Sequence, residues 1–280
     1  MSALVTADHL RSELERDAPL LLDVRWTLAG PDRAGYLAGH LPGAVFCDLD
    51  ADLAGPPGAG GRHPLPDPTS LTESFRRLGV GPGTSVVVYD GGVAAAAARA
   101  WWCLRWIGHD DVRVLDGGLP AWVAAGGDLA DGEVVPEAAL APSSSSDDDP
   151  PPPGMPTVDA DELTADSSGV LLDARAPERF RGEAEPVDPV AGHIPGARSL
   201  PTARLLDPDG RYLPAPVLRE LLGSVGADGT QPVAAYCGSG VTAAQLVLAA
   251  HEAGVEAALY PGSWSHWITD PSRPVATGPE

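Results

Sequence analysis

The sequence predicts a tandem of two α/β domains, each a mainly parallel sheet flanked by helices. Three observations lead to this prediction: an internal repeat, short apolar runs that alternate with helical patterns, and a linker-like stretch between the two copies. Alternating strands and helices are typical of βαβ units on a parallel sheet. The length of 280 residues allows two domains of ordinary size, each with its own core.

The internal repeat consists of five short motifs that occur twice in the same order. The first copy has them at residues 21–25 (LLDVR), 38–44 (AGHLPGA), 61–66 (GRHPLP), 86–90 (VVVYD) and 116–122 (DGGLPAW). The second copy has them at residues 171–175 (LLDAR), 191–197 (AGHIPGA), 210–214 (GRYLP), 233–237 (VAAYC) and 261–267 (PGSWSHW). A long period that occurs only twice indicates duplicated domains, because the units of a solenoid are much shorter.

Residues 136–156 separate the two copies. They contain a Ser run, three Asp and a run of consecutive Pro. Such a composition cannot form a core and is typical of an extended, partly stiff linker. The predicted domains are therefore residues 1–135 and 157–280, joined by a linker over 136–156.

The apolar runs and capping signals of the first copy predict its elements. Strands are expected near residues 20–23, 45–48, 86–89 and 112–115. Helices are expected over residues 7–16, 70–78, 94–106 and 120–125. The second copy repeats the arrangement, with a helix over residues 242–252 that Gly254 ends.

Residues 236–242 (YCGSGVT) are the stretch that indicates chemistry, because a predicted strand passes there into a helix around Cys237. The glycines let backbone N–H groups turn inward, and the helix start brings its unpaired N–H groups and positive dipole end to the same point. Such an anion cradle favours the thiolate, the nucleophilic form of cysteine. The alternative, an inert core cysteine, does not explain the flanking glycines. The first copy has Asp90 instead, so only the second domain is expected to perform cysteine chemistry.

Composition excludes several classes of protein. The formal net charge of -21 argues against a nucleic-acid partner, which would need a basic face. All 18 cationic residues are Arg, which excludes Schiff-base and P-loop lysine chemistry. Cys47 and Cys103 form no CxxC pair and are expected to be packing residues, so no zinc site is indicated. The chain shows neither a membrane-spanning apolar run nor a signal-peptide pattern, so we expect a soluble, cytoplasmic protein.

Taken together, the motifs resemble the rhodanese family, specifically its two-domain sulfurtransferases, over nearly the whole chain. The resemblance rests on LLDxR and GH(L/I)PGA in both copies, the cysteine loop and the closing GSWSHW. It implies tandem rhodanese-like domains, a transiently persulfidated cysteine in the second domain, and neither metal nor organic cofactor. The loop CGSGVT is similar to that of 3-mercaptopyruvate sulfurtransferases, whereas thiosulfate sulfurtransferases of this family carry cationic residues directly after the cysteine.

The resemblance also implies roles for the residues of the cysteine loop. Cys237 would be the nucleophile, and loop amides would stabilise the sulfur anion. These amides are those of Gly238, Gly240, Val241 and Thr242. Ser239 matches a family serine that assists proton movement, although serine is also a common small turn residue.

Outside the loop, the resemblance assigns Arg179 to the substrate carboxylate, a role that suits its planar fork; the alternative is a local ion pair. A second family arginine lies in a Glu-Pro-Arg context, where this chain has residues 185–187 (EPV), which predicts weaker substrate binding. Asp32 and His40 lie where the family has relay partners of the serine. His193 repeats His40, which favours a structural role for both histidines.

The expected reaction is a ping-pong transfer in which the Cys237 thiolate takes sulfur from 3-mercaptopyruvate and releases pyruvate. The expected partners are a small anionic sulfur donor and a thiol, cyanide or thioredoxin-like acceptor, with neither nucleic acid nor membrane. A thiosulfate sulfurtransferase and a non-catalytic persulfide carrier stay open as alternatives. A cysteine phosphatase is disfavoured, because the loop has Thr242 and Ala243 where a phosphate-gripping arginine would stand.

Overall fold

The structure is a computed structural model that describes residues 2–136, 154–165 and 169–279. Contacts divide the chain into two compact units. Unit 1 contains Met1–Gly55, Pro66–Met155 and Asp209–Arg211, and unit 2 contains Pro56–Leu65, Pro156–Pro208 and Tyr212–Glu280. Each copy of the repeat therefore contributes one short segment to the unit that is built on the other copy. Residues 137–153, most of the predicted linker, lie outside the described residues.

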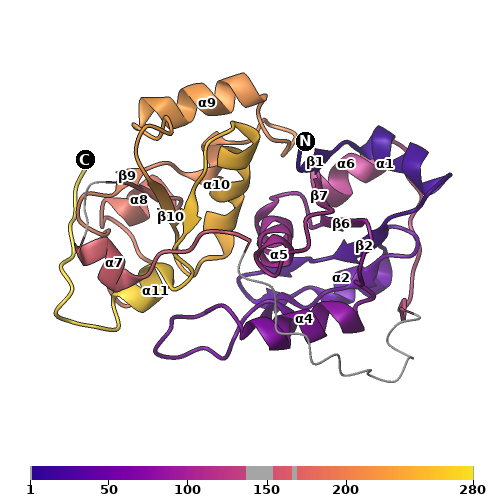
Figure 1. Ribbon diagram of the computed structural model, residues 1–280, viewed down its shortest axis with the longest axis horizontal. Helices are drawn as coiled ribbons and strands as arrows, with labels where there is room; N and C mark the ends of the chain where they lie inside the picture. Colours follow the sequence, from indigo (N-terminus) through magenta and orange to yellow (C-terminus); the bar gives the residue numbers. More distant parts are fainter. Residues whose placement is uncertain (1, 137–153, 166–168, 280) are drawn as a thin grey trace. The chain divides into compact units, whose positions relative to one another are not determined.

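Unit 1 is built on a five-stranded parallel sheet with the strand order β1-β7-β6-β2-β5 (Figure 1). Its strands are β1 (Leu4–Val5), β2 (Leu20–Asp23), β5 (Val45–Phe46), β6 (Val86–Tyr89) and β7 (Val112–Leu115). The predicted strands over 20–23, 86–89 and 112–115 are confirmed at both ends, and the strand at residue 45 is shorter than predicted. A separate antiparallel hairpin pairs β3 (Trp26–Thr27) with β4 (Gly30–Pro31).

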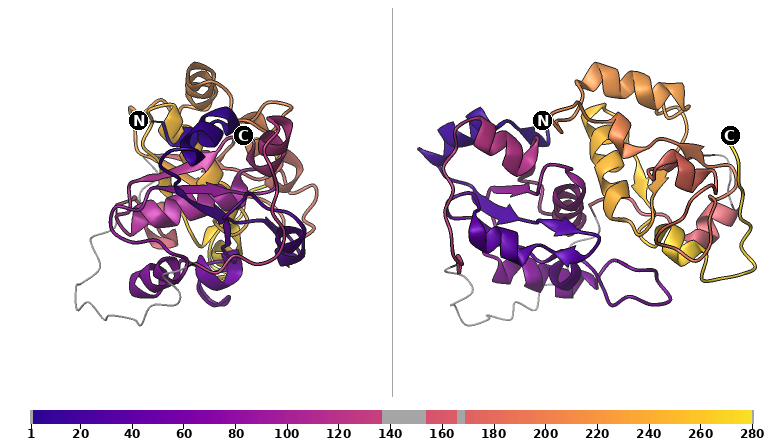
Figure 2. Two further views of the ribbon diagram at one scale, coloured as in Figure 1. Left: turned by 90° about the vertical axis from the view of Figure 1, so that its right-hand side faces the viewer. Right: turned by 180° about the vertical axis from the view of Figure 1, so that it is seen from behind.

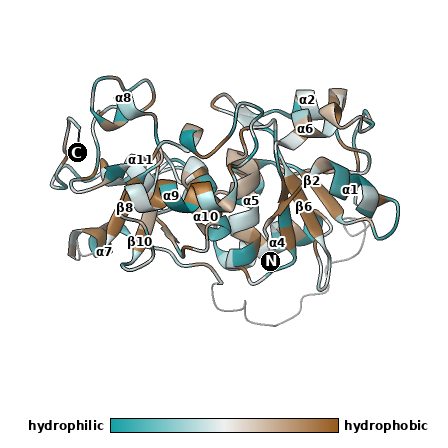
Figure 3. Ribbon diagram, turned by 90° about the horizontal axis from the view of Figure 1, so that it is seen from above, coloured by the Kyte–Doolittle hydropathy of each residue, from teal (hydrophilic) through white to brown (hydrophobic). Residues whose placement is uncertain are grey.

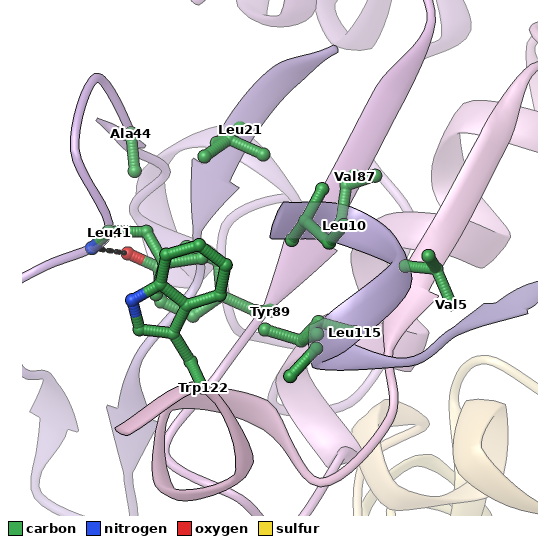
Figure 4. Packing of buried hydrophobic residues seen from close by; sticks show 10 residues of the cluster. Val5, Leu10, Leu21, Leu41, Ala44, Val87, Tyr89, Leu115 and Trp122 are labelled. Atoms are coloured by element: carbon green, nitrogen blue, oxygen red, sulfur yellow. Dashed lines mark hydrogen bonds between the residues drawn. The ribbon is translucent and has the colours of Figure 1, made fainter. Parts of the chain in front are cut away.

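Helices cover both faces of this sheet, since every residue of β6 is fully buried. They are α1 (Ala7–Leu14), α2 (Arg33–Ala38), α3 (Leu49–Asp52), α4 (Pro68–Arg77), α5 (Ala95–Trp106) and α6 (Gly118–Ala124). Leu10 of α1 and Trp122 of α6 pack on Val87 and Tyr89 in one core cluster (Figure 4). The Tyr89 hydroxyl accepts the N–H of Leu41 at 3.1 Å and so ties this core to the turn before β5.

Unit 2 repeats the plan with a four-stranded parallel sheet in the order β11-β10-β8-β9. Its strands are β8 (Val170–Asp173), β9 (Arg198–Ser199), β10 (Val233–Tyr236) and β11 (Ala258–Leu259). A parallel bridge from Thr157 to Leu259 takes the place of β1. The helices are α7 (Ala160–Ala165), α8 (Pro177–Phe180), α9 (Ala215–Ser224), α10 (Val241–Glu252) and α11 (Ser263–Trp267), with a 3-10 turn, η2, at Thr202–Arg204.

Hydrophobic residues concentrate in the strands of both sheets, as Figure 3 shows for β2, β6, β8 and β10. Helix α10 is apolar on all sides, and it is buried between β10 and α9. No helix among the described residues is both long and apolar enough to cross a membrane.

Residues 56–65, which we call the strap, connect α3 to α4 as a long loop (Figure 2). Reciprocal backbone bonds between Gly58 and Gly61, both 3.0 Å long, close its tip. The strap lies within the first copy in sequence but belongs to unit 2 by its contacts. It therefore contributes to the surroundings of Cys237.

Candidate active site

Cys237 follows strand β10 directly and lies in the loop that leads into α10. The residue is buried, and its Sγ accepts the N–H of Gly240 at 3.2 Å. Gly240 has φ +81°, and a Cβ there would stand 2.3 Å from the Pro261 carbonyl oxygen, so the turn requires glycine. Val241 and Thr242 form the first helical turn beside it, where N–H groups lack helical partners. These N–H groups lie where they can stabilise negative charge that develops on the sulfur.

The closing GSWSHW motif holds the cysteine loop from behind through three consecutive residues. The Ser263 hydroxyl accepts the Cys237 N–H at 3.1 Å and donates to the Tyr260 carbonyl at 2.9 Å. The N–H of Trp264 donates to the Cys237 carbonyl at 3.0 Å, and that of Ser265 donates to the Gly238 carbonyl at 2.9 Å. The backbone of Cys237 is thus held by hydrogen bonds on both its N–H and its carbonyl side.

The strap brings a histidine to the cysteine loop. The Arg62 N–H donates to the Ser265 hydroxyl at 3.0 Å, which places the next residue, His63, over the loop. Nδ1 of His63 lies 2.8 Å from the Ser239 hydroxyl, a hydrogen-bond distance. Ser239 and His63 therefore form a pair that can pass a proton beside Cys237.

Two guanidinium groups lie against Gly238, the residue after Cys237. A Cβ at Gly238 would stand 2.8 Å from Nη2 of Arg62 and 3.5 Å from Nη2 of Arg179. Both arginine side chains keep some contact with solvent, at 33% and 18% exposure. Paired guanidinium groups suit the recognition of a planar carboxylate.

Two buried carboxylates hold these arginines in place. The two oxygens of Asp188 contact different arginines: Oδ1 pairs with Arg62, and Oδ2 lies 3.1 Å from Nη2 of Arg179. Glu185 accepts from Nε and Nη2 of Arg179 at 3.0 and 2.7 Å. Burial opposes ionisation of Glu185, but Arg179 and backbone N–H donors outweigh it and lower the pKa of this carboxyl.

A third arginine beneath the site, Arg175 of the LLDAR motif, has a structural role. It is buried, donates to Asp173 and to the Gly192 carbonyl, both at 2.6 Å, and stacks on the Trp264 ring at 4.7 Å. Asp173 and the other carboxylate neighbours raise the pKa of Arg175 against the effect of burial, so it stays charged.

A family model described as "Rhodanese-like domain" matches residues 6–125 and 158–270, most of the chain. The chain belongs to the rhodanese family. Both copies of the repeat are rhodanese-like domains, which confirms the predicted tandem fold. The closing motif and the cysteine loop described above lie in the second of these domains.

Curated rhodanese-family relatives match over nearly their full length. The "Putative thiosulfate sulfurtransferase SseB" of Mycobacterium tuberculosis is 48% identical over 290 residues, which cover 98% of this chain and 97% of that protein. The "Probable 3-mercaptopyruvate sulfurtransferase" of Pseudomonas aeruginosa is 46% identical over 289 residues and 98% of each chain. The crystal structure of the 3-mercaptopyruvate sulfotransferase SseA from Escherichia coli matches with a TM-score of 0.79 at 31% identity, covering 95% of this chain and 100% of that one. The chain is a sulfurtransferase of the thiosulfate/3-mercaptopyruvate type.

The rhodanese fold places the residues predicted from the sequence in two groups. Cys237 and Ser239 lie together in the loop with the amides named above, and Arg179 lies against Gly238. Asp32 and His40 instead make local bonds in unit 1, where Asp32 caps α2 through the Gly35 N–H at 2.9 Å.

His40 and His193 make equivalent bonds in the two rhodanese-like domains. Nδ1 of His40 lies 2.9 Å from the Tyr36 carbonyl, and Nδ1 of His193 lies 2.8 Å from the Phe180 carbonyl. Each ring also stacks on the side chain of that partner. Both histidines therefore make the same local contacts in their own domains, and the histidine at hydrogen-bond distance from Ser239 is His63.

Three residues of the site were not selected from the sequence: Arg62, His63 and Asp188. One signal was present, because the GRHPLP motif has only a shorter echo, GRYLP, in the second copy. Within this motif, Tyr212 of the second copy stands at the position of His63. This difference between the copies indicates that His63 is not part of what the two domains share. Cys47 and Cys103 are buried as predicted, and burial raises the pKa of both thiols.

Proposed function

We propose that this rhodanese transfers the sulfur of 3-mercaptopyruvate to a thiol or cyanide through a Cys237 persulfide and releases pyruvate. One observation carries the proposal: a neutral Gly238-Ser239 loop next to two guanidinium groups whose charge is offset by two carboxylates. Such a set of groups suits a donor with a single negative charge. It suits the dianion thiosulfate less.

The substrate carboxylate binds between Arg62 and Arg179 in this proposal. Both guanidinium groups lie against Gly238, so a carboxylate held there keeps the donor beside the cysteine loop, where its sulfur can be attacked by Cys237. Arg62 supplies the second cation that the EPV sequence at residues 185–187 lacks.

In the first half-reaction the Cys237 thiolate attacks the sulfur of the bound donor. A sulfur–sulfur bond forms, the carbon–sulfur bond breaks, and its electron pair leaves on the enolate of pyruvate. The proton of the donor thiol passes through the Ser239 hydroxyl to His63, which lies 2.8 Å from it, and from there to the enolate. The products are the Cys237 persulfide and pyruvate.

In the second half-reaction an acceptor anion, a thiolate or cyanide, attacks the outer sulfur of the persulfide. The sulfur–sulfur bond breaks, and its electron pair returns to Cys237. The Gly240 N–H and the start of α10 stabilise the departing thiolate. This step regenerates the free enzyme.

The proposal is tested by comparing pyruvate release from 3-mercaptopyruvate with sulfite release from thiosulfate, on the full chain with cyanide or a dithiol as acceptor. We expect the larger kcat/KM for 3-mercaptopyruvate. A larger kcat/KM for thiosulfate would overturn the choice of donor and leave sulfur transfer through Cys237 in place.

Thiosulfate is the second candidate donor, and one observation favours it. The Mycobacterium tuberculosis relative carries the name "Putative thiosulfate sulfurtransferase SseB". Thiosulfate carries no thiol proton. Its use would therefore be independent of the Ser239–His63 pair, and this independence separates the two candidates experimentally.

A further inference from the structure

The group of charges around Arg62 and Arg179 has an unusual arrangement. One carboxylate, that of Asp188, joins an arginine of the strap to an arginine of α8, with one oxygen on each. The Asp188 side chain is 2% exposed, whereas Arg62 is 33% exposed. A buried carboxylate therefore lies behind two cations that are open to a ligand.

The ion pairs leave this group nearly neutral. Arg62 and Arg179 are two cations, and Asp188 and Glu185 are two carboxylates that are almost completely buried. Glu185 also accepts the N–H groups of Val187 and Asp188, both at 3.1 Å, which favours its ionised form. Within the described part of the chain, the positive charges of the two arginines are therefore balanced by the two carboxylates that contact them.

We propose that Asp188 determines the donor specificity of this sulfurtransferase by aligning Arg62 with Arg179 while cancelling one of their two charges. The inference rests on the proposed function of the site. A monoanionic carboxylate gains the two aligned hydrogen-bond donors and needs little net positive charge. A dianion gains the same hydrogen bonds but leaves an uncompensated negative charge beside partly buried groups.

Asp188 also links specificity to the position of the strap. Two contacts of Arg62 hold the strap in place. Its backbone N–H donates to the Ser265 hydroxyl, and its guanidinium pairs with Asp188. The next residue is His63, whose ring contacts Ser239. Asp188 is accordingly a positioning residue that acts through Arg62 and Arg179.

The test is the ratio of kcat/KM for thiosulfate to kcat/KM for 3-mercaptopyruvate, measured on the full chain. Asp188→Asn preserves shape and removes one negative charge, so we expect the ratio to rise by at least about fivefold, the effect of one unit charge about 4 Å from the donor at the dielectric of water. Glu185→Gln removes a charge from the same group and is expected to raise the ratio in the same direction. This second variant keeps the proposal testable where Asp188→Asn disturbs folding.

Glu183→Gln is the matched control. Glu183 lies two residues before Glu185 but pairs with Arg181 at the surface, where its side chain is 58% exposed. We expect its ratio to equal that of the wild type, because exposed charges are screened by solvent. The double variant Arg62→Gln with Asp188→Asn restores charge balance, and its ratio is expected to return toward the wild-type value.

Two outcomes would overturn the proposal. An equal loss of kcat/KM for both donors in Asp188→Asn and Glu185→Gln would mean that these residues only support the structure. A ratio change of the same size in Glu183→Gln would mean that net charge, and not Asp188, sets the preference. Failure of the proposed function is a separate result, because it is seen in the ratio of the wild type and not in the change caused by substitution.

Discussion

The two rhodanese-like domains share the loop after their central strand but fill it with different groups. In unit 2 the loop holds the Cys237 sulfur, which accepts the Gly240 N–H. In unit 1 it holds the Asp90 carboxylate, which accepts the N–H groups of Gly92, Ala94, Ala96 and Ala97 at 2.9 to 3.2 Å. Burial raises the pKa of Asp90, and these four donors counteract the rise.

The difference shows that the anion cradle belongs to the fold and that reactivity depends on the residue placed in it. A carboxylate fixed in the cradle uses the N–H donors of the loop and helix start itself. When the loop carries a thiol instead, the N–H donors can stabilise negative charge that develops on sulfur during its transfer. In unit 1 the Asp90 carboxylate thus occupies N–H donors of the loop and helix start.

A second difference concerns the segment that reaches each loop from the other copy of the repeat. In unit 2 this segment is the strap, with Arg62 and His63. In unit 1 it is Asp209–Arg211, where Gly210 packs so closely that a Cβ would stand 2.6 Å from the Gly92 carbonyl. The next residue, Tyr212, takes the sequence position of His63, and a phenol cannot replace imidazole as a base at neutral pH.

The largest expected effect comes from making the two loops alike. Cys237→Asp copies Asp90 into unit 2, and Cys237→Ser removes the nucleophile with little change in size. We expect either substitution to reduce sulfur transfer from both donors by at least roughly 10³-fold, because no persulfide can form. Steady-state rates and the mass of the enzyme after incubation with donor measure the effect. A persulfide on the Cys237→Ser protein would refute the assignment of the nucleophile.

A smaller loss of sulfur transfer is expected when His63 of the strap is replaced by tyrosine, the residue at this position in the other copy. His63→Tyr removes the base beside Ser239, and we expect kcat with 3-mercaptopyruvate to fall by about 10²-fold, the usual contribution of general acid–base catalysis. Thiosulfate has no thiol proton, so its kcat is expected to change much less. Ser239→Ala removes the other group of the Ser239–His63 pair and tests the same difference between the two donors. Equal losses with both donors would argue that His63 acts only in packing.

Displacing the strap without changing its charges should have a moderate effect. Gly61 has φ +105°, and a Cβ there would stand 2.8 Å from the Gly262 carbonyl oxygen. Gly61→Ala is therefore expected to shift Arg62 and His63 and to lower kcat/KM for 3-mercaptopyruvate by about tenfold, the scale of a small misplacement of positioning groups. Gly210→Ala is the matched control in unit 1. We expect it to lower the thermal stability and to leave kcat/KM unchanged. Equal kinetic losses in both variants would contradict the separate roles of the two segments.

The smallest effect on transfer is expected for the non-catalytic loop. Asp90→Asn leaves a neutral acceptor where a buried carboxylate accepted four N–H donors, so we expect a loss of about 2 kcal/mol in the free energy of unfolding. Sulfur transfer should stay within about twofold of the wild type below the melting transition, since surviving native protein keeps the unit 2 site. Chemical denaturation and donor kinetics on the same preparation provide the check. A large loss of activity without a loss of stability would give Asp90 a role in catalysis.

The sequence alone predicted those features that depend on local pattern. The repeat, the strands at residues 20–23, 86–89 and 112–115 and the buried helix around Cys103 follow from periodicity and turn chemistry over short windows. The cysteine loop followed in the same way, because a strand, a glycine turn and a helix start are adjacent in the chain. Short elements such as α2 and the β3–β4 hairpin were not predicted, since a few residues show no periodicity.

Only the tertiary structure decided which side chains surround the sulfur. Ser239 and His63 are 176 positions apart, and Arg62 and Asp188 are 126 positions apart. The repeat made His40 and His193 stand out in the sequence. In the structure, these two histidines make equivalent bonds to backbone carbonyls of their own domains. The physical reason is that folding brings the strap onto the loop of the other copy through contacts that no local pattern encodes. The sequence by itself therefore determined the fold and the cysteine loop, and tertiary packing determined that His63, Arg62 and Asp188 lie beside this loop.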